Sequence, residues 1–178
     1  MAVSTRKDTH GNAGVANARG IAYGASRMAQ PGVNLAELIA SGAVIVPLEA
    51  ATFDGAVEAL LRPALSRAGL AADAIDRCIE TVLRREAAGS TASGRAALPH
   101  GRSDAVSRVV AGLGLNRDGI AGREHTQAML AFISPQSAVV EHLHFLSASA
   151  KLFRNESAVE RLLAASNADE VLALLRDF

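Results

Sequence analysis

The chain of 178 residues contains five histidines, whose imidazole rings change charge near neutral pH and can act as nucleophiles. His100 lies in the segment ALPHGRSDA, residues 97–105, behind a proline and in front of a glycine. Pro99 fixes its own φ and favours an extended conformation at Leu98, so a strand should end here and present His100 rigidly in the following loop. Gly101 allows close approach of a partner, or a φ that other residues resist. Such an imidazole can attack a phosphoryl or acyl group; the alternative is an ordinary surface loop that contains a histidine.

A phosphoryl group on His100 would carry negative charge that must be met by hydrogen-bond donors. Suitable donors are arginine side chains, a second histidine and backbone N–H groups. The arginines that lie close to His100 in the sequence are Arg84, Arg85, Arg95 and Arg102.

Two further histidines, His142 and His144, lie two residues apart in a segment with helical periodicity. Two residues turn a helix by about 200°, so both rings cannot face one site, and a helical metal pair would need a spacing of three or four. The predicted apolar stripe of this helix consists of Val139, Leu143, Leu146, Ala150 and Phe153. His142 is next to that stripe and His144 is displaced from it, but periodicity alone does not decide which ring faces a site.

Helix and strand patterns alternate irregularly along the chain, which predicts an α/β fold with a mixed β-sheet flanked by helices. Helices are expected over residues 34–41, 52–69, 71–89, 137–153, 156–166 and 168–178. Strands are expected over residues 43–46, where Pro47 stops the first one, and over 95–98, 107–115 and 128–134. Asn34 and Asn167 are predicted N-caps. Gly69 should end the second helix, and Pro63 should kink or divide it.

Residues 1–33 are rich in Gly, Ala, Ser and Asn and have no sustained period, which predicts a flexible, disordered leader before a single domain at 34–178. His10 falls in this leader, and we assign it no role. The formal net charge is zero and no apolar run approaches the ~20 residues that span a bilayer, so we expect no nucleic-acid partner and no membrane insertion. Cys78 has no disulfide partner and lies at helical spacing with apolar residues, which predicts a buried position in a cytoplasmic protein.

The segment RREAAGSTASGRAALPHGRSDAV, residues 84–106, resembles the active-site segment of the fructose/mannitol-type enzyme IIA (EIIA) domain of the bacterial phosphoenolpyruvate-dependent phosphotransferase system (PTS). In that family an Arg-Glu pair ends a helix, a Ser/Thr-rich stretch follows, and a strand delivers a Pro-His-Gly or Pro-His-Ala tripeptide with the phosphorylated histidine. The matching residues here are Arg85, Glu86, Thr91, Pro99, His100 and Gly101.

A second segment, VVEHLHFLSASAKLF, resembles the family's helix that begins near Glu-His-Leu and whose histidine faces the phosphorylated one. The match falls on His142, and the nitrogen-regulatory branch of the family also carries a His-Leu-His triplet at this point. The order of elements agrees from Leu35 to Phe178. The resemblance therefore implies a PTS EIIA type-2 domain at residues 34–178, with a phosphotransferase/anion-transport-protein-like sandwich fold.

This resemblance also implies a phosphotransferase component in PTS sugar uptake. His100 would accept a phosphoryl group from the phosphocarrier HPr, or its nitrogen-branch equivalent, and pass it to a cysteine of an enzyme IIB partner. Arg85 and His142 would stabilise the phosphate, and no metal or other cofactor would be needed. Partners would contact Pro99, Gly101 and Arg102. The segment that leads to His100 is one residue shorter than in some mannitol-type members, so Arg84 is an alternative to Arg85.

Two other functions remain open at this point. One is a regulatory binding module of the nitrogen-branch type, in which phosphorylation of His100 controls kinases or transporters. The other is a metal-dependent hydrolase that uses His100, His125 and His142. It ranks last because the sequence lacks a tight carboxylate–histidine motif, and because a lone histidine in a polar loop, such as His125, is usually only solvated.

Overall fold

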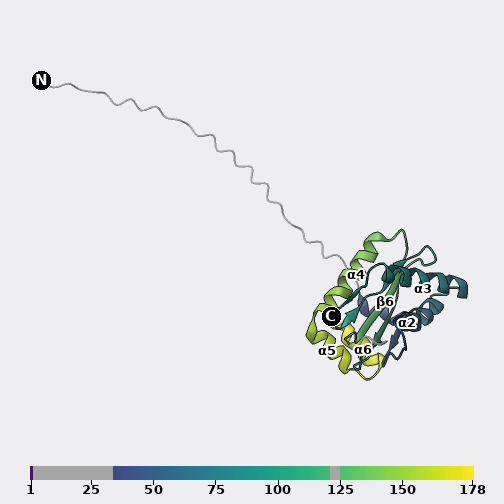
Figure 1. The fold of residues 1–178 in the computed structure, drawn as a ribbon. Helices are drawn as coiled ribbons and strands as arrows, with labels where there is room; N and C mark the ends of the chain where they lie inside the picture. The colour runs from purple at the N-terminus through teal and green to yellow at the C-terminus, as the bar shows by residue number, and fades with distance from the viewer. Residues whose placement is uncertain (2–33, 121–124) are drawn as a thin grey trace. The chain divides into compact units, whose positions relative to one another are not determined.

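The computed structural model describes Met1 and residues 34–120 and 125–178, so the predicted leader lies, apart from Met1, outside the described residues (Figure 1). The helices are α1 Leu35–Ala40, α2 Phe53–Arg67, α3 Ala72–Ala87, α4 Val139–Arg154, α5 Glu156–Ala164 and α6 Ala168–Arg176. The strands are β1 Ala43–Ile45, β2 Ala92–Ser93, β3 Ala96–Ala97, β4 His100–Arg102, β5 Val110–Leu115 and β6 Ala128–Ser134. None of the helices in these ranges is long and apolar enough to cross a membrane.

Within the described residues, the six strands form one mixed sheet in the order β1-β5-β6-β3-β2, and β4 also pairs with β6. Strands β5 and β6 are antiparallel, whereas β1 runs parallel to β5. Both β3 and β4 run parallel to β6, so β6 carries two short strands in succession along one edge. The prediction of an α/β fold with a mixed sheet is confirmed.

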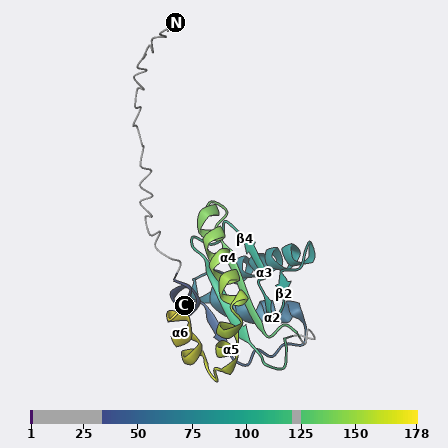
Figure 2. The same ribbon diagram turned by 90° about the vertical axis from the view of Figure 1, so that its left-hand side faces the viewer.

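Strand β6 lies at the centre of the molecule's core, and all seven of its residues are buried. Its side chains alternate between two apolar clusters because successive residues of a strand point to opposite faces of the sheet. Met129 and Ile133 pack on the α2–α3 side, and Leu130 and Phe132 pack on the side of α1, α4, α5 and α6. Figure 1 shows α2 and α3 on one side of the sheet with α4 and α5 on the other, and Figure 2 shows α4 in front of it.

Most of the predicted helix ends are confirmed. The side chains of Asn34 and Asn167 accept hydrogen bonds from backbone N–H groups at the starts of α1 and α6. Gly69 follows α2 with a φ of +86°, a conformation that costs glycine little. Pro63 does not divide α2, which runs unbroken through it, and the other expectation, a kink at Pro63, stays a prediction. The apolar face of α2 is buried along its whole length, and this packing outweighs the backbone hydrogen bond that proline cannot make.

The predicted apolar stripe of α4 is wrong at its first two positions. Val139 is 47% exposed and Leu143 is 55% exposed. The face that packs on the sheet consists of His142, Phe145, Ser149 and Leu152. Polar residues occupy two of these positions because each finds a buried hydrogen-bond partner, whereas the sequence prediction placed only apolar side chains inward.

Candidate active site

His100 is the first residue of strand β4, whereas the sequence predicted a loop between two strands. It lies opposite Phe132 in the parallel pairing of β4 with β6. The backbone N–H of Phe132 donates to the carbonyl of Pro99 at 3.0 Å. The strand was missed because three residues with one glycine carry no apolar alternation. The pairing groups come from the edge of β6, which lies about 30 residues further along the chain.

One nitrogen of the His100 ring is held by the backbone. Its Nδ1 lies 2.7 Å from the carbonyl oxygen of Leu98. A carbonyl can only accept, so Nδ1 carries the proton and Nε2 keeps its lone pair in the neutral ring. The ring also stacks on Phe132, with centroids 5.2 Å apart and planes 13° apart. The structure therefore fixes both the tautomer and the orientation of the imidazole.

The tripeptide around His100 packs tightly against helix α3. A Cβ atom on Gly101 would lie 3.1 Å from Cγ2 of Val82 and 3.2 Å from Cγ2 of Thr81. The close approach expected at Gly101 is thus made to this chain's own helix. Pro99 is also buried, so Pro99 and Gly101 hold His100 in place and Arg102 is the more accessible residue of the segment.

His142 lies beside His100, as the resemblance implied. The two ring centroids are 5.4 Å apart, and the rings are tilted by 56°. His142 is buried and its Nδ1 lies 2.7 Å from Oγ of Ser134, the last residue of β6. His144 is exposed on another side of α4, and His125 is exposed as well.

Both rings are shifted toward the neutral form. Burial is the main cause that lowers the pKa of His100; the positive charge of Arg85 adds to it, and the Leu98 carbonyl and the charge of Glu86 oppose it. The pKa of His142 is lowered first by burial and then by the charges of His100 and Arg102. The lowered pKa favours the neutral form of His100, in which one ring nitrogen keeps its lone pair, as a nucleophilic imidazole requires.

The structure separates the neighbouring arginines Arg84 and Arg85. Arg85 lies close enough to His100 for its charge to lower the pKa of the ring, and it donates a hydrogen bond to the carbonyl of Gly89 at 2.8 Å. Arg84 pairs instead with Glu80, at 3.6 Å, on the surface of α3. That Arg85 stabilises a phosphate stays a prediction, but the charge of Arg85 contributes to the lowered pKa of the His100 ring.

Arg102, at the end of β4, lies within electrostatic reach of His142. Its guanidinium donates to the backbone carbonyl of Gln136. Its Nε is buried and has no hydrogen-bond partner among the described residues. Arg102 therefore adds a second positive charge to the side of the histidine pair that lies toward α4.

A buried carboxylate closes the C-terminal end of α3. Glu86 accepts hydrogen bonds from the hydroxyl and the backbone N–H of Thr91, at 2.6 Å and 2.9 Å, and from the hydroxyl of Ser90 at 2.8 Å. The chain that returns to β3 is thereby attached to the helix that carries Arg85. The family's Arg-Glu and Ser/Thr elements are thus in contact in this structure.

Two contacts of the site were missed by the sequence prediction, those of Ser134 and of the Leu98 carbonyl. A signal for Ser134 was present, because it is the one polar residue at the end of the otherwise apolar run 128–134. No sequence signal identifies a backbone carbonyl as the partner of a ring nitrogen.

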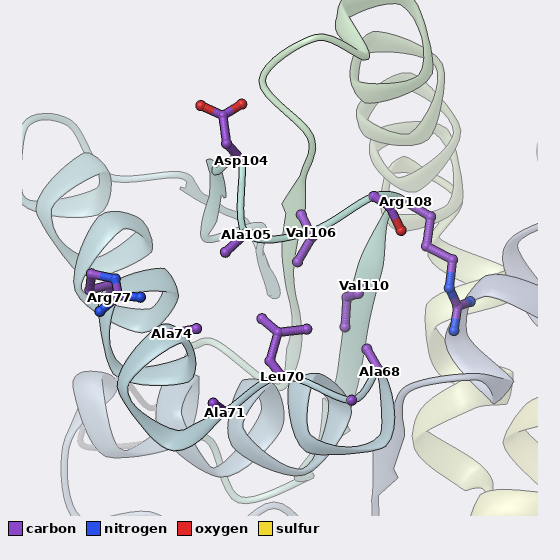
Figure 3. Close-up of a pocket in the computed structure, with 12 residues that line it drawn as sticks. Ala68, Leu70, Ala71, Ala74, Arg77, Asp104, Ala105, Val106, Arg108 and Val110 are labelled. Atoms are coloured by element: carbon purple, nitrogen blue, oxygen red, sulfur yellow. The ribbon is translucent and has the colours of Figure 1, made fainter.

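A cavity of about 680 Å³ lies between the α2–α3 turn and the segment that leads from β4 to β5. Figure 3 shows that Leu70, Val106 and Val110 line it, and no histidine does. Among residues 34–120 and 125–178, no three His, Cys, Asp or Glu side chains lie together as a metal site requires. The histidine pair therefore lies outside this cavity, and His100, His125 and His142 do not lie together as ligands of one metal ion.

The model of the family described as "phosphoenolpyruvate-dependent sugar phosphotransferase system, EIIA 2" matches residues 37–178. The chain belongs to this EIIA family. Membership supports a phosphotransfer role in the sugar PTS or in its nitrogen branch, and it agrees with the resemblance of the His100 and His142 segments. It also supports the assignment of the chain to the transferases as a PTS component.

A curated relative is the PTS fructose-specific EIIA component of Haloferax volcanii. It is 31% identical over 132 residues, which are 71% of this chain and 84% of the relative. The crystal structure of the nitrogen regulatory protein IIA-Ntr from Neisseria meningitidis is similar with a TM-score of 0.67 and 25% identity; the match covers 79% of this chain and 97% of that one.

Mannitol enzyme IIA from Escherichia coli has the same fold. Its crystal structure matches with a TM-score of 0.62 and 22% identity, over 76% of this chain and 96% of that one. The solved complex of that enzyme IIA with phosphorylated mannitol enzyme IIB matches with the same TM-score. These likenesses confirm the predicted sandwich fold of the EIIA family.

Proposed function

We propose that the protein is a phosphocarrier that accepts a phosphoryl group on Nε2 of His100 from a phosphohistidine of HPr or its nitrogen-branch equivalent. The observation that carries this proposal is the 2.7 Å contact between Nδ1 of His100 and the Leu98 carbonyl, because it leaves Nε2 unprotonated in the neutral ring. The lowered pKa of His100 keeps the ring in that form at neutral pH.

In the first step the lone pair of Nε2 attacks the phosphorus atom of the donor. A nitrogen–phosphorus bond forms at His100, and the nitrogen–phosphorus bond of the donor breaks. Its electron pair returns to the donor imidazole. The proton on Nδ1 stays in its hydrogen bond to Leu98, so the step needs no general base.

Positioning and charge stabilisation are the chief contributions that a protein makes to phosphoryl transfer. His142, whose ring centroid is 5.4 Å from that of His100, would donate to a phosphoryl oxygen. Arg85 would supply positive charge on the α3 side. Arg102 would add charge on the α4 side, at the edge where a partner arrives.

In the second step a cysteine thiolate of an enzyme IIB partner attacks the same phosphorus. A sulfur–phosphorus bond forms, the bond to Nε2 breaks, and its electron pair returns to His100. The complex of mannitol enzyme IIA with phosphorylated enzyme IIB supports a partner of this class. Cys78 of this chain does not serve as acceptor, because it is buried in the α2–α3 core.

The surface beside the histidine pair suits a protein partner. Among the described residues, the large apolar side chains that are exposed are Val139, Val140 and Leu143, together with the two chain ends Met1 and Phe178. The first three lie on the N-terminal two turns of α4, on either side of His142. Exposed apolar groups next to a reactive residue are typical of protein-binding sites.

Intact mass measurement tests the proposal. We expect the wild type, incubated with phosphoenolpyruvate, enzyme I and HPr or its nitrogen-branch equivalent, to gain one acid-labile phosphoryl group. His100→Ala should gain none. His144 is exposed and lies two residues from His142, so His144→Ala should gain the phosphoryl group as the wild type does. Absence of the gain in the wild type, with a donor system shown to be active on a known EIIA, would overturn the proposal.

A regulatory function is the second candidate, and the likeness to IIA-Ntr favours it. In that case His100 would still be phosphorylated, but the phosphorylation state would control the docking of the protein to a kinase or transporter. The two functions are distinguished by chase experiments: loss of the phosphoryl group to enzyme IIB supports sugar uptake, and its retention in the presence of every enzyme IIB of the same genome supports regulation.

A further inference from the structure

We propose that Ser134 is a positioning residue that fixes the tautomer of His142, so that His142 presents an N–H group to the phosphoryl group on His100. This inference rests on the proposed function for its consequence, but its central claim concerns a hydrogen bond within the free protein. Ser134 is fully buried, and its Oγ lies 2.7 Å from Nδ1 of His142.

The direction of this hydrogen bond follows from the number of available partners. A hydroxyl can donate one hydrogen bond and can also accept, and a neutral imidazole has one nitrogen of each kind. The contact with His142 is the hydrogen bond that Oγ of Ser134 makes within the described residues. If Nδ1 of His142 donated, the hydroxyl proton of Ser134 would be a buried donor with no acceptor, at a cost of about 1–3 kcal/mol. Donation by Ser134 satisfies both groups.

With its lone pair at Nδ1 engaged, neutral His142 carries its proton on Nε2. Within the described residues this nitrogen has no hydrogen-bond partner, so it can donate to a ligand beside the ring. A neutral donor is available at pH 7 because burial and the charges of His100 and Arg102 lower the pKa of His142. Without Ser134 the ring would exchange between its two tautomers, and in one of them Nε2 would meet the phosphoryl oxygens with a lone pair.

The backbone holds Ser134 itself in place. It lies opposite Arg102 in the pairing of β4 with β6, and its carbonyl accepts from the N–H of Ser103 at 2.9 Å. His100 is opposite Phe132 in the same register. One pair of strands thus fixes both the residue that carries the nucleophile and the residue that orients its neighbour.

Nitrogen-15 NMR of the histidine side chains tests the inference in the full chain without any phosphoryl donor. We expect wild-type His142 at pH 7.5 to show a protonated Nε2 and an unprotonated Nδ1, and Ser134→Ala to show an exchange-averaged pattern at both nitrogens. Ser134→Thr keeps the hydroxyl and should restore the pattern. A protonated Nδ1 in the wild type, or an unchanged pattern in Ser134→Ala, would overturn the inference.

Ser149→Ala is the matched control. Ser149 is also fully buried, but its Oγ donates to the Phe145 carbonyl of its own helix, at 2.8 Å. The control removes the same hydroxyl from the same core and should leave the ring of His142 unchanged. Thermal unfolding of each variant verifies that the fold is retained.

The rate of phosphoryl uptake from phospho-HPr then tests the consequence. We expect Ser134→Ala to be about tenfold slower than the wild type, and Ser134→Thr and Ser149→Ala to remain within about twofold. A normal rate in Ser134→Ala, with an active wild type, would overturn the role of Ser134 and leave the proposed function intact. A wild type that takes up no phosphoryl group would overturn the proposed function, and the NMR result would still decide the tautomer.

Discussion

In His100 the nitrogen Nδ1 contacts the carbonyl oxygen of Leu98, whereas in His142 the same nitrogen contacts the hydroxyl of Ser134, at 2.7 Å in both cases. A carbonyl only accepts, so Nδ1 of His100 donates to it and carries the proton of the neutral ring, which leaves a lone pair on Nε2. The Ser134 hydroxyl has no other acceptor among the described residues, so by the inference above it donates to Nδ1 and the proton of His142 is on Nε2. In the proposed function, the imidazole would therefore act as a nucleophile at position 100 and as a hydrogen-bond donor at position 142.

The two groups that hold these rings, the Leu98 carbonyl and the Ser134 hydroxyl, are their anchors. The anchors differ in which substitutions can remove them. The anchor of His100 is a main-chain group two residues before it, and no side-chain substitution at Leu98 removes it. The anchor of His142 is a side chain on another element, and a single substitution deletes it. His100 is therefore held by the main chain between β3 and β4, and His142 is held by the packing of α4 on β6.

The largest effect, after the loss of His100 itself, is expected from His142→Ala. The variant should still be phosphorylated on His100 but about 100-fold more slowly, because a preorganised donor to the developing charge is missing. Stopped-flow or quench measurements with phospho-HPr give the rate. His144→Ala, in the same helix but exposed, should react at the wild-type rate. Equal rates in all three proteins would remove His142 from the site.

A smaller effect on the phosphorylation rate is expected from the neighbouring residues Arg84 and Arg85. Arg85→Ala should lower the phosphorylation rate about tenfold, and Arg84→Ala should change it less than twofold, because only the charge of Arg85 lowers the pKa of His100. NMR titration of the same two variants measures the pKa of His100 directly. The pKa of His100 should rise in Arg85→Ala and stay constant in Arg84→Ala. The reverse order would assign the site to Arg84.

The backbone anchor of His100 is tested at Gly101. An alanine there would place a Cβ atom 3.1 Å from Cγ2 of Val82, so β4 and α3 would have to separate slightly. We expect Gly101→Ala to lose about 1–2 kcal/mol of unfolding free energy in urea titrations. Gly89→Ala is the control, since its Cβ would meet nothing within 4 Å. An unchanged stability in Gly101→Ala would show that this packing does not hold the strand.

The sequence predicted the mixed sheet, the helix caps and the identity of the two facing histidines. These features depend on local patterns or on the family motif around Pro99 and Glu141. It did not predict β4, because that strand exists only through the edge of β6. It also misplaced the buried face of α4, since the inward position of Ser149 depends on a hydrogen bond and not on hydrophobicity. The contact of His100 with the Leu98 carbonyl depends on the local backbone conformation, which no residue type identifies in advance.

The smallest effect concerns stability as a function of pH. Both rings have a lower pKa in the folded chain than the ordinary histidine value of 6.5, with burial as the main cause. Below that value the unfolded chain therefore binds more protons than the folded chain, and the free energy of unfolding rises with pH in this window. The stability that the neutral rings contribute is complete above pH 6.5 and is lost as the pH falls through the folded pKa values.

Urea unfolding between pH 5 and pH 8 measures this slope, and the double variant His100→Gln/His142→Gln should have less of it than the wild type. The single variants His100→Gln and His142→Gln show how much of the slope each ring contributes. The Leu98 carbonyl raises the pKa of His100 and so opposes the effect of burial on that pKa. The charges of His100 and Arg102 lower the pKa of His142 and so act in the same direction as its burial. A double variant with the full wild-type slope would show that the acid sensitivity comes from groups other than these two rings.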